Sequence, residues 1–383
     1  MAYVATRGGE RAIVEAERLY RAGLGPIDRS RVETVGAALP MLIDRVMGEA
    51  SLYAPDLAAL ALTQAGGDLY EAVLLLRAWR TTQARLAVAE PARPEDQIVH
   101  RRISAAFKDV PGGQVLGPTL DYSHRLLETG VLQGVPFHPA PPEPAARPAQ
   151  ARRPSVAAWE KANGLVAAVT PPSAPVAPDA IPDLTREPML FPAHRAHRLQ
   201  ALARADTGGV LALGYSAMRG YGSDHPTVNE LRLSEIEVRV KHPLGTTFSA
   251  GRIRMSQAEV VSKKGEQLTL GFCATFGWNE VKAIAGATLD LNAAGAAKGS
   301  PVEEEFFLYH TEPVEASGFC IHLKLPHYVT FQSSLDAMRD ARRKRAAADA
   351  GVAGTGVAGA GAANERADEQ DGAADHGTER EIA

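Results

Sequence analysis

The chain contains very little cysteine: only Cys273 and Cys320 occur among its 383 residues. Two cysteines exclude a disulfide-rich scaffold, and they supply too few thiolates to hold an iron–sulfur cluster. A surplus of charge is missing as well, because the formal net charge is only −4. This balance gives no electrostatic reason to expect a nucleic acid or an anionic membrane as a partner.

Long apolar runs are also missing. The first residues contain no apolar signal core, and no run is long enough to cross a bilayer. We therefore expect a soluble, cytoplasmic protein that binds neither membranes nor nucleic acid. The sequence also has no P-loop, no Rossmann fingerprint, no zinc-protease helix motif and no nucleophile elbow.

What is present is a chain of ordinary globular composition. A length of 383 residues and an apolar content of 45% are enough for two or three domains with a real core. Changes in composition divide the chain into four parts. These are a mainly helical part (1–135), a Pro/Ala-rich linker or insertion (136–182), a mixed part (183–348) and a tail that we expect to be disordered (349–383).

Helical periodicity dominates the first part. Apolar residues recur on one helical face within residues 12–20 and again within residues 35–47. Pro40 interrupts the second pattern and predicts a kink or a late start. A longer helix is predicted from Asp68, as its N-cap, to about Glu90.

Strand periodicity dominates the mixed part. The short apolar run at residues 210–213 favours a strand, and Ile236, Val238 and Val240 alternate with charged residues, as in a strand with one solvated face. Further predicted elements are strands around Met255 and Leu270 joined by a turn at 264–265, a helix at 279–291 and a helix at 330–347. The predicted fold class is α+β, with a helical N-terminal part followed by a mixed part of antiparallel sheet and helices.

The richest polar segment spans residues 101–125. It places basic side chains around two glycine-containing turns, at 111–113 and 117–118. Glycine lets backbone N–H groups approach an anion closely, and arginine binds phosphate through two hydrogen bonds. The candidate phosphate ligands are Arg101, Arg102, Lys108, Gln114 and Arg125.

Two further sets of polar residues could carry chemistry. Asp121 and His124 lie three residues apart where a helix is predicted to begin, so they could share a face and act as acid and base. The loop at 219–226 has two glycines and ends in His225-Pro226, which suits a ligand. Both segments are also explained as surface loops or tight turns, and the residues alone leave that alternative open.

Two histidines flank Pro326, just before the last predicted helix. His322 and His327 are five positions apart, so their rings cannot converge on a continuous helix or strand. They can converge only if the chain turns between them, as at a strand-to-helix corner. Two convergent imidazoles suit a zinc-like ion, with Cys320 a conceivable third ligand. The alternative is two polar residues and a small buried thiol at an ordinary corner.

Four segments together resemble the PhnI family, the I subunit of the bacterial carbon–phosphorus lyase core complex. These segments are residues 3–10, 101–127, 219–226 and 322–328. The resemblance runs in order from residue 1 to about 345, apart from the Pro/Ala-rich part. It matches His322 and His327 to the family's paired metal-site histidines.

This resemblance implies a role in phosphonate breakdown. With partner subunits, the family transfers a phosphonate such as methylphosphonate to C1′ of the ATP ribose, so that adenine leaves and a ribose 1-phosphonate 5-triphosphate forms. Asp121 and His124 are then the candidates for acid–base or ring-stabilising roles.

The resemblance also implies cofactors and partners. They are a divalent metal such as zinc, Mg²⁺ with ATP, lyase subunits of the G, H, J, K and L types, and a dimer within the complex. The iron–sulfur step belongs to the J subunit. A metal-assisted nucleosidase acting on ATP or GTP and a non-catalytic scaffold of the complex are the alternative functions.

Overall fold

The computed structural model describes residues 9–93, 97–139, 153–166, 180–221, 225–293 and 296–355. Contacts between Cα atoms separate two compact units, of which Gly8–Lys324 is called the main unit here. The second unit includes the chain from Leu325 onward. The described residues form helices and one four-stranded antiparallel sheet, so the α+β prediction is confirmed.

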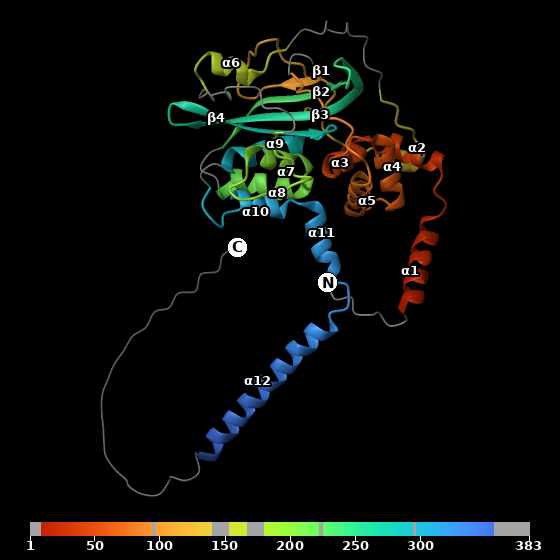
Figure 1. Ribbon diagram of the computed structural model, residues 1–383, viewed down its shortest axis with the longest axis vertical. Coiled ribbons are helices and arrows are strands. Elements are labelled where there is room, and N and C mark those ends of the chain that lie inside the picture. The colour runs from red at the N-terminus through yellow and green to blue at the C-terminus, as the bar shows by residue number, and fades with distance from the viewer. Residues whose placement is uncertain are drawn as a thin grey trace, which may run out of the picture. The chain divides into compact units, whose positions relative to one another are not determined.

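Five helices form the first part of the main unit (Figure 1). They are α1 (Gly9–Leu24), α2 (Arg29–Ala38), α3 (Pro40–Ala50), α4 (Pro55–Gln64) and α5 (Leu69–Thr81). Pro40 is the first residue of α3, as its missing N–H and fixed φ favour, so the predicted interruption is confirmed. Buried residues of α3, α4 and α5, among them Met47, Leu62 and Leu76, form one apolar cluster.

The fifth helix begins where the sequence predicts and ends earlier. The side chain of Asp68 accepts a hydrogen bond from the N–H of Glu71, which confirms it as the N-cap. The helix ends at Thr81 instead of Glu90, so the predicted end is wrong. Two β-branched residues, Thr81 and Thr82, weaken the helix there. The N–H of Glu90 instead donates to the carbonyl of Arg239, in β2, at 2.8 Å.

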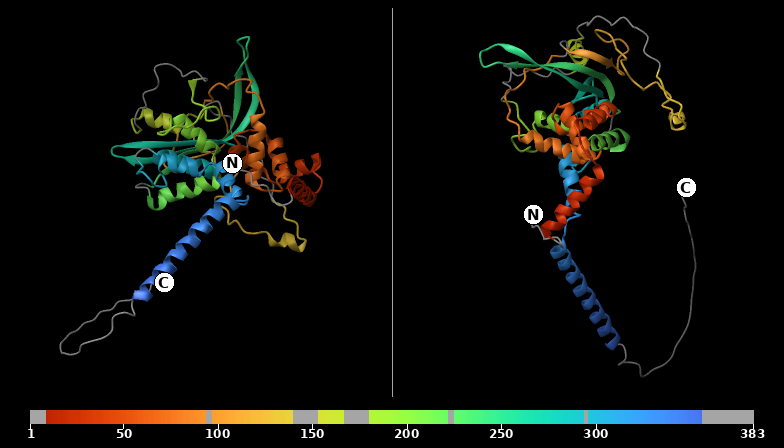
Figure 2. Two further views of the ribbon diagram at one scale, coloured as in Figure 1. Left: turned by 60° about the horizontal axis from the view of Figure 1, so that its bottom comes forward. Right: turned by 90° about the vertical axis from the view of Figure 1, so that its right-hand side faces the viewer.

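The sheet has the strand order β1-β2-β3-β4, with every neighbouring pair antiparallel. Its strands are β1 (Ile98–Ile103), β2 (Thr227–Lys241), β3 (Thr247–Lys264) and β4 (Gln267–Phe276). The predicted alternation at residues 236–240 and the turn after Lys264 are both confirmed. Residues 237–241 and 247–252 lie beyond the pairings with β1 and β4 and form an exposed two-stranded hairpin (Figure 2).

Two helices, α7 (Arg195–Arg204) and α9 (Glu280–Ala293), contact one face of the sheet (Figure 1). The helix α8 (Thr207–Ser216), which continues into the π-helical turn η4 (Ala217–Tyr221), packs on α9. The helix α10 (Glu304–His310) packs on α7 and α8, and α11 (Pro313–His322) packs on α5. The predicted helix at 279–291 is confirmed by α9. The predicted strand at 210–213 is wrong, because those residues lie inside α8. Asp206 caps this helix, and a short apolar run does not distinguish a strand from a buried helix turn.

The backbones of α9 and β4 approach each other very closely. A Cβ atom added to Gly271 would lie 2.1 Å from the carbonyl oxygen of Ala287, and one added to Gly286 would lie 2.7 Å from Sγ of Cys273. Cys273 itself is fully buried, and burial raises the pKa of its thiol to about 12. The thiol therefore stays protonated and fills space between helix and sheet.

We expect Gly271→Ala to lower the free energy of unfolding by about 1–3 kcal/mol or more, because the added methyl group forces the two backbones apart. Urea denaturation followed by circular dichroism measures the change. Gly23→Ala in α1 is the matched control, since nothing lies within 4 Å of its added Cβ and alanine favours a helix. Equal midpoints for both variants and the parent would contradict this packing.

Part of the Pro/Ala-rich segment is ordered. Residues 156–162 form α6 (Val156–Ala162), which contacts β2 on the side of the sheet opposite α9 (Figure 1). The ring centroids of Trp159 and Phe107 are 5.2 Å apart, so this piece packs against the segment after β1 through Trp159. Residues 140–152 and 167–179 of the predicted linker lie outside the described residues. The remaining short helix is η2 (Thr129–Gln133).

The second unit contains the long helix α12 (Tyr328–Thr355), which confirms the predicted C-terminal helix. It extends through residues 349–355, which were predicted to belong to a disordered tail. Residues 356–383 of that tail lie outside the described residues. None of the helices in the described parts of the chain is long and apolar enough to cross a membrane.

Candidate functional site

Arg102, a predicted phosphate ligand, lies in β1 with a fully buried side chain. Its Nε donates to the carboxylate of Glu230. Its two other nitrogens donate to the carbonyls of Pro111 (2.8 Å), Gly113 (2.7 Å) and Pro154 (2.8 Å). All three guanidinium nitrogens therefore bind protein groups. The side chain ties the 111–113 turn and the start of the α6 segment to the sheet.

Arg102 also borders a buried cluster of carboxylates beneath α6. Glu230 accepts from Arg232 at 2.7 Å, and Glu160 and Glu259 both accept from the side-chain amide of Asn229, at 2.8 and 3.2 Å. Burial and the neighbouring Glu230 raise the pKa of Glu259 to about 7. The cluster thus depends on its arginines for charge compensation.

Arg101 has a similar position on the other side of β1. Its side chain is 1% exposed, its Nη1 donates to the carbonyl of Leu116 at 2.7 Å, and its Nη2 donates to Asp121. The carboxylate of Glu280, in α9, lies 3.0 Å from its Nε. Gly117 permits this arrangement, because a Cβ there would lie 2.3 Å from the carbonyl oxygen of His100. Arg101 therefore holds the second turn against the sheet.

The side chain of Gln114 bonds to the backbone of the loop that follows β1. Its Oε1 accepts from the N–H of Ser104 at 3.0 Å, and its Nε2 donates to the carbonyls of Phe107 and Lys108 at 3.2 and 2.9 Å. Lys108 itself is exposed. Gln114 therefore shapes the loop, whereas the Lys108 ammonium group is accessible to a ligand.

The segment from Leu120 to Glu128 is exposed and contains no helix, so the helix predicted to begin at Asp121 is wrong. Arg125 has a φ of 51°, a left-handed conformation that ends a helical turn. The Asp121 carboxylate is held by Arg101 and lies 3.4 Å from Nη2 of Arg125. Asp121 and His124 therefore share a loop and not a helical face. His124 is exposed on that loop.

His225 lies just before β2 and is exposed. The predicted ligand loop begins within the π-helical turn η4, and residues 222–224 lie outside the described residues. The part of the loop that the structure describes brings none of the other candidate residues into hydrogen-bonding contact with His225.

The paired histidines belong to different units, one on each side of the boundary between Lys324 and Leu325. His322 is the last residue of α11, and His327 directly precedes α12. Residues 323 and 324 form a turn after α11, and the strand predicted before it is wrong. Glu312 caps α11 by accepting from the N–H groups of Val314 and Glu315, each at 2.8 Å, so the chain enters the corner as a helix.

Each histidine ring is held by the backbone next to it. Nδ1 of His322 donates to the carbonyl of Phe319, and Nδ1 of His327 donates to the carbonyl of Leu325 at 2.6 Å. Metal-ligating histidines commonly donate a ring N–H in this way, so each ring by itself has the donor chemistry of a ligand. Cys320 is exposed, so its prediction as a buried thiol is wrong. No group of three or more His, Cys, Asp or Glu side chains in the described structure could hold a metal.

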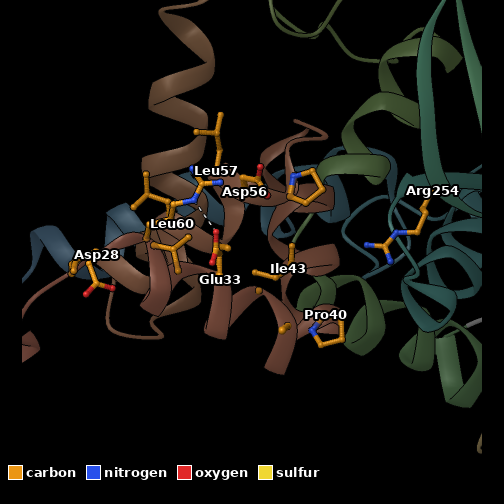
Figure 3. Close-up of a pocket in the computed structure, with 15 residues that line it drawn as sticks. Asp28, Glu33, Pro40, Ile43, Asp56, Leu57, Leu60 and Arg254 are labelled. Atoms are coloured by element: carbon orange, nitrogen blue, oxygen red, sulfur yellow. Dashed lines mark hydrogen bonds and ion pairs between the residues drawn. The ribbon is translucent and has the colours of Figure 1, made fainter.

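Two of the cavities in the described part of the main unit are considered as ligand sites. The first, of about 830 Å³, lies among α2, α3 and α4, with Arg254 of β3 at its edge (Figure 3). Its two arginines have partners within the protein: Arg29 pairs with Glu33 at 2.8 Å, and Arg254 pairs with Asp44 at 2.6 Å. These contacts stabilise α2 and join α3 to the sheet, and we assign the cavity no ligand.

The second cavity, of about 650 Å³, is called the arginine cavity here. It lies where α5, α7, α10 and α11 meet a segment before α7. Its charged lining residues are Arg77, Arg80, Arg204, Glu187, Glu312 and Glu315. The sequence analysis did not predict this cavity. Arg77 and Arg80 are three residues apart, a spacing that places both side chains on one face of a helix and indicates a local cationic surface.

Comparison with known proteins identifies the family. A model of the family described as "Bacterial phosphonate metabolism protein (PhnI)" matches residues 2–345. The chain belongs to the PhnI family. Two relatives carry the name alpha-D-ribose 1-methylphosphonate 5-triphosphate synthase subunit PhnI. The one from Rhizobium meliloti (strain 1021) is 42% identical over 91% of this chain and 97% of its own length. The one from Escherichia coli (strain K12) is 41% identical over 90% and 99%.

A third relative of this chain is the putative C-P lyase subunit protein HtxH of Stutzerimonas stutzeri. It is 40% identical over 91% of this chain and 98% of its own length. The predicted resemblance and the role in phosphonate catabolism are therefore confirmed. The functions predicted for individual residues stay predictions.

Proposed function

We propose that this chain is the PhnI-type subunit of a ribose 1-phosphonate 5-triphosphate synthase that transfers a phosphonate to C1′ of the ATP ribose and releases adenine. The observation that carries the proposal is the full-length match to two relatives named as the 1-methylphosphonate synthase subunit. Because one relative is named as a lyase subunit, we take the other lyase subunits as partners. The individual G, H, J, K and L types, a dimer and a cytoplasmic location belong to this proposal.

Displacement at an anomeric carbon sets the chemical requirements. The transition state resembles an oxocarbenium ion, so it needs negative charge near the ribose ring and a proton for the departing base. The triphosphate and the phosphonate need cationic partners that hold them in line. Asp121 fits the first requirement because its carboxylate side chain is 45% exposed while Arg101 fixes its position.

The remaining candidates divide by their accessibility. His124 is exposed near Asp121 and is our candidate for the proton donor. Lys108, Arg125 and His225 are exposed and can contact phosphate groups. The buried Arg101 and Arg102, with Gln114, hold the loop that follows β1, on which Lys108, Asp121, His124 and Arg125 lie. Their part in the reaction is then positioning.

The two histidines supply the metal part of the proposal. His322 and His327 would hold a divalent ion such as zinc, as the resemblance to the family implies, and a bound zinc ion would supply positive charge that stabilises developing negative charge. Mg²⁺ would accompany the ATP phosphates. No iron–sulfur cluster is expected on this chain, which has two cysteines.

A reconstituted assembly tests the proposed function. The full chain is mixed with its partner subunits, ATP and methylphosphonate, and the products are separated by chromatography. A ribose 1-phosphonate 5-triphosphate supports transfer. Free ribose 5-triphosphate alone would show a nucleosidase. No base release, together with loss of assembly on chelation, would show a scaffold.

We expect His124→Gln to slow adenine release in this assembly by roughly 10²- to 10⁴-fold, the effect of losing a general acid, and to leave ATP affinity nearly unchanged. His138→Gln is the matched control, because His138 is also an exposed histidine of the described structure. Equal rates for both variants would place the proton donor elsewhere.

A further inference from the structure

The arginine cavity concentrates positive charge that the protein uses only in part. Arg77 is 7% exposed and fully engaged: it donates to the carbonyls of Glu49 and Arg204 and to the carboxylate of Glu312. Arg80 has one long hydrogen bond, 3.4 Å to the carbonyl of Ser51, and forms no ion pair with a carboxylate of the described residues. The cavity therefore has one neutralised and one weakly engaged arginine.

The third arginine is the most exceptional group of the cavity. The side chain of Arg204 is 16% exposed, and its nearest carboxylate oxygen, on Glu312, is 3.8 Å away. That same oxygen already accepts from Arg77. The Nε of Arg204 is buried and has no hydrogen-bond partner. A buried donor without a partner costs free energy unless a ligand satisfies it.

The acidic lining residues do not remove this excess. The Glu312 carboxylate serves Arg77 and also caps α11, where its other oxygen accepts from the N–H groups of Val314 and Glu315. Glu187 pairs with His197 at 3.2 Å, and Glu315 is exposed. Of the three lining carboxylates, Glu312 is the one that forms ion pairs with the guanidinium groups of Arg77 and Arg204, while Glu315 acts on Arg204, and Asp183 on Arg80, only at longer range.

The electrostatics of the guanidinium groups agree with this geometry. Burial and the neighbouring Arg77 lower the pKa of Arg204 to about 10, and the same two causes lower the pKa of Arg80. Burial and mutual repulsion destabilise the positively charged guanidinium groups, and an anion bound between them would stabilise them. Guanidinium groups bind tetrahedral oxyanions in particular, since each can donate two parallel hydrogen bonds.

We propose that the arginine cavity binds a tetrahedral phosphorus oxyanion through Arg80 and Arg204. Its volume of about 650 Å³ is large enough for a phosphate group together with an organic substituent, and its walls include apolar residues such as Leu184, Met189 and Leu308. The oxyanion could belong to a nucleotide triphosphate or to an alkylphosphonate. The naming of these two molecules rests on the proposed function, whereas the binding of an oxyanion does not.

Binding to the full chain tests the proposal in a buffer without phosphate. Calorimetry and thermal melting are measured with inorganic phosphate, methylphosphonate and ATP as three separate probes. In the parent, at least one probe binds and raises the thermal midpoint. Arg80→Gln and Arg204→Gln should each weaken that probe by roughly 10- to 100-fold, the effect of one lost charge-assisted hydrogen bond. Preference for ATP or for methylphosphonate identifies the source.

The stability of the variants without ligand separates a binding site from a structural one. Because these arginines repel one another, Arg204→Gln should leave the ligand-free thermal midpoint unchanged or raise it. Arg85→Gln is the matched control: Arg85 lies outside the cavity lining, is paired with Asp183 at 2.6 Å, and should change neither binding nor its probe preference.

Two results would overturn the proposal: a parent that binds none of the three probes, or Arg80 and Arg204 variants that bind as the parent does. If Arg204→Gln folds poorly, the affinity of Arg80→Gln for the probe still tests the site. Because binding is measured without partner subunits, failure of the site is distinguishable from failure of transfer, which is measured in the assembly.

Discussion

Arg102→Ala is expected to lower the free energy of unfolding by about 3–5 kcal/mol, the cost of breaking a buried ion pair from one side. The substitution leaves the buried Glu230 carboxylate with Arg232 and removes the donors to three carbonyl groups. The buried carboxyl groups of Glu259 and Glu160 lie nearby and would share the loss of positive charge. Urea denaturation of the full chain measures the loss.

Arg125→Ala is the matched control for this effect. Arg125 is also a predicted phosphate ligand of the same segment, but its side chain is 62% exposed, so its removal should change stability by less than about 0.5 kcal/mol. If Arg102→Ala instead unfolded like the parent and lost only ATP affinity, Arg102 would be a ligand residue and its buried contacts would matter little.

The second large effect concerns the metal. Replacing His322 and His327 by alanine together should remove a bound divalent ion and abolish phosphonate use, while the thermal midpoint stays nearly constant. The stability should survive because His327 is exposed and His322 is only half-buried, so neither contributes a core contact. Elemental analysis of the purified protein and product analysis in the reconstituted assembly measure the two losses.

His310→Ala provides the control for the metal experiment. Its Nδ1 donates to the carbonyl of Phe306 at 2.7 Å, so its ring is oriented as in the paired histidines, but it lies in α10, away from the corner. It should retain the parent's metal content and activity. Equal metal content in the double variant and the parent would disprove the assignment of His322 and His327 as ligands.

Local sequence signals predicted the elements that they determine. Asp68 and Pro40 mark helix starts because a capping carboxylate and a missing N–H act within one turn. The alternation at Ile236, Val238 and Val240 predicted a strand because side chains of a strand alternate between faces. These predictions needed no knowledge of distant residues.

Other predictions failed where distant contacts decide. The apolar run at residues 210–213 is too short to distinguish a strand from a helix. These residues are helical because Asp206 caps α8 and because α8 packs against α9. Arg101 and Arg102 are buried because they meet Glu280 and Glu230, which lie more than a hundred residues away in the chain. The arginine cavity combines four helices and was invisible for the same reason.

The contacts of Arg102 have a consequence for how the family can vary. Three of its four partners are carbonyl oxygens of the main chain, at positions 111, 113 and 154, and any amino acid supplies such an oxygen. Selection on this contact therefore acts on residue 102 and on the path of the backbone, not on the identity of residue 154. The ordered end of the Pro/Ala-rich segment can then drift in sequence among relatives while it keeps its place on the sheet.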